Sequence, residues 1–255
     1  MTTTVAAAAN CVRERIRWFY PGMATLCMVV AFGGFIPTFF LPLAQGTFER
    51  PPIFYLHGVL FFGWTVFFFS QAWLAASGRV ATHRRWGLLG PALATAMTLT
   101  MFGVVIARLH MTPAFTYGPG SPAFVWEDVA EISFFLSCIG LGIVNTRRPD
   151  LHRRLMLLGT LALLNTPIAR WNGILFPGFG DPHVPQPFFV EQWENLAAGG
   201  LIAMAAAIDT RLTGRLSRVW LVGLPVYLLF NFTRMQIGLT PMGLGMADWL
   251  KGVLG

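Results

Sequence analysis

Four charged residues lie well inside apolar stretches of the 255-residue sequence: Glu131, Arg170, Glu194 and Arg234. Each is sixteen or seventeen residues from an arginine at one end of its own stretch. At about 1.5 Å per helical residue, all four would reach a similar depth, roughly 24 Å from those ends. Because an ionised side chain in hydrocarbon is costly unless it is paired or hydrated, we expect these side chains to face one another in a polar, charge-lined chamber.

Several polar residues lie at a comparable level. We expect His57 and Asp128 at the rim of the chamber, and the amides of Asn172, Asn195 and Asn231 near its charges. Carboxylates, guanidinium groups and amides together are suited to binding a small or amphiphilic ligand, and an acid–base pair among them would permit catalysis by a membrane-embedded enzyme. An ion- or proton-coupled transporter is an alternative, and the sequence names no substrate.

A purely structural role is another alternative. Asp128, Glu131 and Glu194 lie near the N-terminal turns of their helices, whereas Arg170 and Arg234 lie near C-terminal turns. Each sign matches the helix dipole at that position, and long charged side chains near a membrane surface can extend into water. The same pattern is therefore also typical of a structural membrane subunit held together by ion pairs.

The five histidines raise the question of a b-type haem or a divalent metal. His57 and His110 form the better candidate pair, which would make the chain a redox protein, although no HExxH or ExxH pattern occurs. His83 and His152 lie among arginines at the expected water boundary. Anionic lipid headgroups are the partners that we expect there, for the following residues: Arg79, His83, Arg84, Arg85, His152, Arg153 and Arg154.

The elements that must position these residues are long apolar helices. The chain is 55% hydrophobic and only 11% charged, which is typical of an integral membrane protein and does not favour a nucleic-acid partner despite the net charge of +7. We predict one all-α domain over residues 1–255. Seven apolar runs are long enough to span a bilayer, at about 18–41, 53–76, 87–108, 126–145, 155–175, 191–210 and 219–239.

Arginine clusters fall at every second junction between these runs. Because positive charge favours the cytoplasmic side, this pattern predicts a cytoplasmic N-terminus and a periplasmic C-terminus in a bacterial inner membrane. The chamber would then lie in the outer half of the bundle.

Two junctions also resemble each other. The segments GRVATHRRWGLLG from Gly78 and TRRPDLHRRLMLLG from Thr146 share an arginine, a His-Arg-Arg triplet and a Leu-Leu-Gly ending at the same spacing. The helix hairpins formed by spans two and three and by spans four and five are therefore candidate repeats.

The stretch from 53 to 172 carries the segments LHGVLFFGWTVFFFSQAWLAASGRVATHRRWG, RRPDLHRRLMLLGTLALL and IARW. In its His-Gly, Gly-Arg and His-Arg-Arg elements it resembles a group of uncharacterised bacterial polytopic inner-membrane proteins. The resemblance implies a polytopic fold and a role for His57, Gln71, Arg79, His83, His152 and Arg170. It brings no activity with it.

Overall fold

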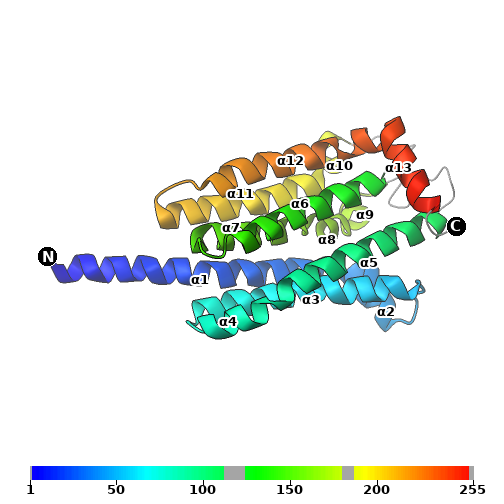
Figure 1. Cartoon of the computed structure of the whole chain (residues 1–255). Helices are drawn as coiled ribbons and strands as arrows, with labels where there is room; N and C mark the ends of the chain where they lie inside the picture. Colours follow the sequence, from blue (N-terminus) through cyan, green and yellow to red (C-terminus); the bar gives the residue numbers. More distant parts are fainter. Residues whose placement is uncertain (1, 112–123, 180–186, 253–255) are drawn as a thin grey trace.

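The computed structural model describes residues 2–111, 124–179 and 187–252, and within these ranges every regular element is helical (Figure 1). The main helices are α1 (Thr2–Gly34), α3 (Pro52–Ala76), α5 (Leu89–Met111), α6 (Val125–Val144), α7 (Pro149–Ala162), α11 (Trp193–Thr213) and α12 (Arg218–Gly238). Shorter elements are η1 (Ile36–Phe40), α2 (Leu41–Ala44), α4 (Val80–Gly87), α8 (Asn165–Ala169), α9 (Asn172–Leu175), α10 (Phe188–Glu191) and α13 (Pro241–Gly252).

Within the described ranges, four helical segments are long and apolar enough to cross a membrane: Glu14–Ala44, Pro52–Ala76, Val80–Met111 and Trp193–Thr213. They coincide with the first, second, third and sixth predicted spans. Helix α6 is also long, but it carries Glu127, Asp128 and Glu131 close to its N-terminus. Helix α7 has only 14 residues, which is too short to cross a hydrocarbon core by itself.

The fifth predicted run, 155–175, is not one continuous helix. It is divided among the end of α7, α8 and α9, with turns between them. Pro167 lies within this interrupted region, where its missing N–H removes a helical hydrogen bond. The interruption gives Arg170 a position at a bend between two short helices.

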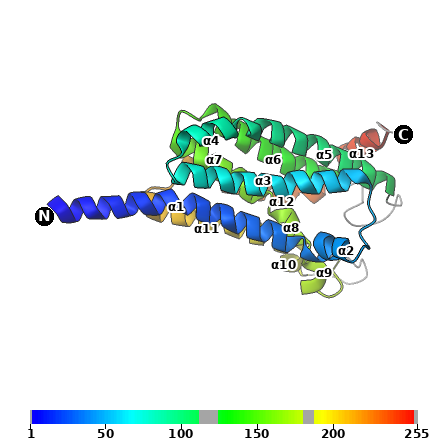
Figure 2. The same ribbon diagram turned by 90° about the horizontal axis from the view of Figure 1, so that it is seen from below.

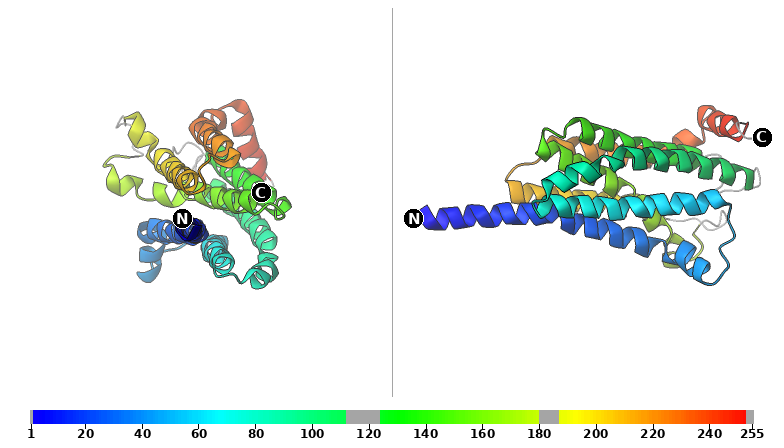
Figure 3. Two further views of the ribbon diagram at one scale, coloured as in Figure 1. Left: turned by 90° about the vertical axis from the view of Figure 1, so that its left-hand side faces the viewer. Right: turned by 60° about the horizontal axis from the view of Figure 1, so that its bottom comes forward.

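The long helices form an elongated bundle with the beginning of α1 projecting from one end and α13 at the other (Figures 1 and 2). Figure 3 shows α1 and α3 beside each other. Helix α11 also packs against α1, because the Tyr20 hydroxyl of α1 donates a hydrogen bond of 3.1 Å to Asp209 of α11. The arginine-rich α3–α4, α6–α7 and α11–α12 turns lie together at the end from which α1 projects (Figure 1).

Two packed clusters hold the bundle together. One is built around α1, α7, α11 and α12 and contains Leu157, Leu161 and Ile202, all without exposed surface. The other is built mainly from α3, α5, α6 and α13 and contains Trp64 and Met97. The Trp64 indole N–H donates a hydrogen bond of 3.2 Å to Thr160 on α7, which links the two clusters.

A close approach between α1 and α8 depends on Gly34. A Cβ at this position would lie 2.7 Å from the carbonyl carbon of Pro167, which real side chains do not tolerate. The neighbouring Gly33 accepts a hydrogen bond of 3.3 Å from the Trp171 indole through its carbonyl oxygen. The end of α1 is therefore fixed directly against the interruption that carries Arg170.

Candidate functional site

The main cavity has a volume of about 690 Å³ and lies where α1, η1, α3, α5 and α6 meet the interrupted helix α8. This volume is within the range of small-molecule sites, roughly 300–1,000 Å³. The cavity reaches the surface beside Arg50 and Met111, which are both exposed. It joins residues that are more than a hundred positions apart in the chain.

One wall of the cavity is aromatic. Phe62 on α3 contacts four phenylalanines of α1 and η1, with ring centroids 4.8 Å away for Phe32 and 5.0 Å away for Phe40. The phenylalanines that line the cavity itself are Phe35, Phe39, Phe48, Phe54, Phe61 and Phe62.

The η1 turn helps to build this wall. The Phe35 carbonyl accepts hydrogen bonds from the N–H groups of both Phe39 and Phe40, at 2.9 and 3.1 Å, so the helix widens by one residue after Gly34. Such local widening changes the direction of the side chains that follow and is frequent at functional sites. Thr38 and Phe39 both line the cavity as a result.

The opposite wall is charged. Asp128 on α6 forms an ion pair with Arg108 on α5, and both side chains are largely buried. Glu131, one turn further along α6, accepts a hydrogen bond of 3.0 Å from the Thr166 hydroxyl. Each of the two acidic residues that line the cavity thus already has a protein partner.

Arg170 is the exception among these charges. It lines the cavity and is exposed, and its guanidinium carbon lies 5.3 Å from the ring centroid of Phe35. Among the residues that the structure describes, it has no ion pair and no hydrogen-bond acceptor. The cavity therefore contains a guanidinium group whose N–H donors have no acceptor among the described residues.

His57 also lines the cavity, from the first turns of α3. Its ring packs against Phe61 at an interplanar angle of 30° with centroids 4.2 Å apart, and its Nδ1 atom is buried without a hydrogen-bond partner in the described part of the chain. The charges of Arg108 and Arg170 both act on this ring, which places His57 close to the basic side of the cavity.

Glu194 and Arg234 belong to a separate buried network beside the cavity. Arg234 forms ion pairs with Glu127 at 3.0 Å and with Glu194 at 3.4 Å. Four asparagines complete the network through side-chain hydrogen bonds: Asn165, Asn172, Asn195 and Asn231. None of these residues lines the cavity.

The predicted chamber residues thus divide into two groups. Glu131, Arg170, His57 and Asp128 line one cavity. Glu194, Arg234 and the three predicted amides lie in the neighbouring network, where every charge has a partner. Depth along a continuous helix can be counted from the sequence. The rotation of each helix about its own axis, which decides whether a side chain faces the cavity or the neighbouring network, cannot be read from the sequence.

His110 is not brought to His57. It is exposed in the last turn of α5 and does not line the cavity. In the described ranges, no three His, Cys, Asp or Glu side chains come together as a group that could hold a metal ion. The geometry therefore gives the His57 and His110 pair no support as a haem or metal site.

The residues that were predicted to bind lipid headgroups are partly exposed and partly buried. Arg79, Arg84 and Arg85 are exposed, but Arg154 is only 3% exposed and donates to Asp209 at 2.7 Å. This corrects the expectation that Arg154 is an exposed lipid contact. Asp209 also accepts from Tyr20 and Trp220, at 3.1 and 2.9 Å, in a network that joins α1, α7, α11 and α12.

The other three basic residues of the two His-Arg-Arg segments are partly buried. His83 bonds to the Gln71 carbonyl at 3.2 Å and His152 to the Gly142 carbonyl at 2.9 Å, so each imidazole anchors its helix to the preceding one. Arg153 forms an ion pair with Asp150 and packs over Tyr20. Helix anchoring is therefore the structural role of both histidines.

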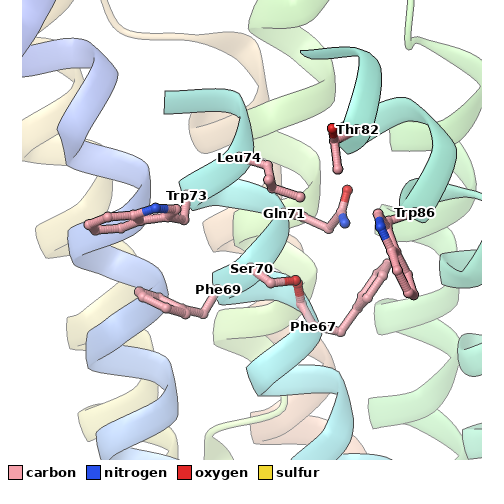
Figure 4. Close-up of a pocket in the computed structure, with 8 residues that line it drawn as sticks. All are labelled: Phe67, Phe69, Ser70, Gln71, Trp73, Leu74, Thr82 and Trp86. Carbon is pink, nitrogen blue, oxygen red and sulfur yellow. The ribbon is translucent and has the colours of Figure 1, made fainter. Parts of the chain in front are cut away.

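A second hollow of about 500 Å³ lies between α3 and α4, near the arginine-rich end (Figure 4). Trp73, Trp86 and Leu74 give it a largely apolar surface, and the Gln71 amide points toward Thr82 and Trp86 (Figure 4). Both polar atoms of this amide are buried and have no partner among the described residues. Because the hollow contains no charged side chain, it is a weaker candidate site than the main cavity.

Sequence reasoning missed several residues that complete these sites. Glu127 lies one helical turn before Glu131 and so shares its face, a signal that was available. Arg50 and Thr166 gave no signal, because neither lies in a recognisable motif. Asp209 was detectable as an acid near the arginine-rich end of an apolar helix, where an unpaired carboxylate is unfavourable.

The chain was compared with known proteins in three ways. No protein-family model matches it, and no curated protein and no solved structure is significantly similar to it. The resemblance to bacterial inner-membrane proteins therefore remains a prediction, and the candidate function rests on the cavity itself.

Proposed function

We propose that this protein is a polytopic membrane protein that binds a small amphiphilic molecule in the cavity between its two packed clusters. The apolar part of the ligand would lie against the phenylalanines of α1, η1 and α3. Its polar part would lie at the charged wall formed by α5, α6 and Arg170. Binding is the common requirement of an enzyme and of a transporter, so the proposal does not depend on which of these follows.

The single observation that carries the proposal is the two-sided lining of one cavity. Six phenylalanines line it together with Glu131, Asp128, Arg108 and Arg170. A site for a water-soluble solute would not need so large an aromatic surface, and a purely apolar lipid would leave the charged wall without a partner. An amphiphile satisfies both walls at once.

We further propose that the chain crosses a bacterial inner membrane seven times with its N-terminus in the cytoplasm. The support comes from the arginine-rich turns, which share one end of the bundle, and from α13, which lies at the other end (Figure 1). The exposed Arg79, Arg84 and Arg85 would then contact anionic headgroups of the cytoplasmic leaflet. The matching anchors of His83 and His152 support a repeat of two helix hairpins.

A photoreactive neutral amphiphile tests the proposed cavity. Full-length protein in phosphatidylcholine nanodiscs would be irradiated with a diazirine derivative of dodecanol, and the labelled residues would be mapped by mass spectrometry. We expect labelling of the cavity wall, including Phe39, Phe62 and Met101. Labelling confined to lipid-facing surfaces such as Leu99 and Leu229 would contradict the proposal.

A pair of glycine variants provides the control. A Cβ at Gly58 would lie 3.7 Å from the Phe39 ring and 3.8 Å from the Phe62 ring, so Gly58→Leu places new side-chain volume against the aromatic wall. Gly140 is exposed and has no atom within 4 Å of a Cβ position. We expect Gly58→Leu to suppress cavity labelling and Gly140→Leu to leave it unchanged.

A further inference from the structure

We propose that the amphiphile carries an anionic head group, a carboxylate or a phosphate, and that Arg170 binds it. This inference rests on the proposed binding function and adds the chemical class of the ligand. Its basis is that the acidic side chains lining the cavity have protein partners, whereas Arg170 has no ion-pair or hydrogen-bond partner among the described residues.

The acidic groups are already engaged. Asp128 is bound by Arg108, and Glu131 is bound by the Thr166 hydroxyl. The nearby Glu127, outside the cavity lining, is bound by Arg234. A cationic head group would therefore have to compete with a protein donor at each of these carboxylates.

Arg170 is in the opposite situation. Its contact in the described structure is the face of Phe35, which leaves the N–H groups in the guanidinium plane without acceptors. A guanidinium group offers five donors in a fixed planar arrangement that matches two oxygens of a carboxylate or phosphate. An anionic head group supplies the acceptors that the protein does not.

The charged side chains that line the cavity also carry a net positive charge, which favours an anionic ligand. Arg50, Arg108 and Arg170 line the cavity together with Asp128 and Glu131, so the lining as a whole has three arginines for two carboxylates. Asp128, Glu127 and Glu131 all interact with Arg170 electrostatically, yet none of them forms an ion pair with it in the described part of the chain. A ligand anion at Arg170 would complete the balance of this lining.

The position of Arg170 explains how it stays available. It lies at the bend between α8 and α9, and its neighbour Trp171 is held by the Gly33 carbonyl. The bend directs Arg170 into the cavity rather than into the network around Arg234, where amide and carboxylate oxygens are plentiful. The interrupted helix thus separates the Arg170 guanidinium, which has no acceptor in the part of the chain that the structure describes, from the acceptors that surround Arg234.

Competition experiments test this inference. The neutral dodecanol photoprobe would be displaced in nanodiscs by dodecanoate, dodecyl phosphate, dodecanol or dodecylamine, which share one chain. A charge-assisted hydrogen bond is worth about one to two powers of ten in affinity, so we expect an anionic competitor to act at a concentration at least about tenfold lower than dodecanol. The comparison of dodecanoate with dodecyl phosphate identifies which anion is preferred.

Arginine variants then assign the effect to one residue. Arg170→Gln should remove the preference for the anionic competitor and retain labelling by the neutral probe, which also shows that the cavity is intact. Arg170→Lys should keep part of the preference because it keeps the charge. Arg215→Gln, which removes the same charge from an exposed position outside the cavity, should change nothing.

The outcomes separate the two proposals. Absence of cavity labelling by the neutral probe would contradict the proposed function itself. Cavity labelling with no preference for the anions over dodecanol, or with the amine as the best competitor, would overturn only the assignment of an anionic ligand. A preference for anions that survives in Arg170→Gln would overturn the role of Arg170.

Discussion

Three arginines of this protein show how differently one side-chain type can be used inside an apolar bundle. Arg154 is buried and bound by Asp209, and Arg234 is buried among two carboxylates and two asparagines. Arg170 instead faces a cavity and has no acceptor within the described ranges. The first two arrangements stabilise the fold, and only the third leaves binding capacity unused.

The Arg154–Asp209 pair gives a stability prediction at this scale. Asp209→Ala leaves the buried guanidinium, among the described residues, with only the 4.0 Å ion pair to the half-exposed Asp150 as charge compensation, and we expect a loss of roughly 3–5 kcal/mol in the free energy of unfolding. Asp150→Ala removes an acid that is 55% exposed and should cost at most about 1 kcal/mol. Thermal unfolding of the two variants in the same nanodiscs gives the comparison, and equal melting temperatures would contradict it.

The limits of sequence reasoning are also clear from single residues. Counting from the arginine clusters places Glu131, Arg170, Glu194 and Arg234 at one depth only where each run is a continuous helix, and the run that carries Arg170 is interrupted. It could not separate Glu131 and Arg170 from the other two, because that depends on helix rotation and on the bend after α8. It also treated Arg154 as an interface residue, although its partner Asp209 is 55 positions away in sequence.

At the scale of elements, the contact between the end of α1 and the interrupted α8 positions the site. Gly34 lets the two backbones approach, η1 turns Thr38 and Phe39 into the cavity, and the bend after α8 does the same for Arg170. The sequence predicted an apolar run in both places. The widening of the helix at η1 had no signal beyond a proline, which is common in ordinary spans.

Two adjacent glycines test the importance of this contact. Gly34→Ala would place a methyl group against the Pro167 carbonyl, and overpacking of this kind typically costs about 1–3 kcal/mol. Gly33→Ala has open space and should be neutral or stabilise α1 by about 0.5–1 kcal/mol. We expect a lower melting temperature and weaker photolabelling for Gly34→Ala alone. Identical behaviour of the two variants would show that α1 adjusts freely.

At the scale of the whole molecule, the helical class and the membrane-crossing character of four segments followed from composition and run length. The three remaining predicted spans contain either buried charge or an interruption, which are the features that make a span functional and also weaken its hydropathy signal. The proposed sevenfold crossing therefore needs a test that does not depend on apolarity.

Reporter fusions provide this test. Alkaline phosphatase fused after Thr240, in the turn before α13, should be active because that turn would face the periplasm. The same enzyme fused after Gly214, in the α11–α12 turn, should be inactive, and green fluorescent protein should give the reverse pattern. Activity at both positions, or the opposite assignment, would contradict the proposed orientation.

The location of the main cavity between two separately packed clusters has a practical consequence for handling this protein. The detergents used to extract membrane proteins are themselves single-chain molecules with polar ends, so each would be a competitor for the same space. A ligand that binds the folded form raises its apparent stability with the logarithm of its concentration. The melting temperature measured in a given detergent would then depend both on how strongly that detergent denatures the protein and on how tightly it binds in the cavity. An anionic detergent at low concentration would therefore be expected to raise the melting temperature by binding.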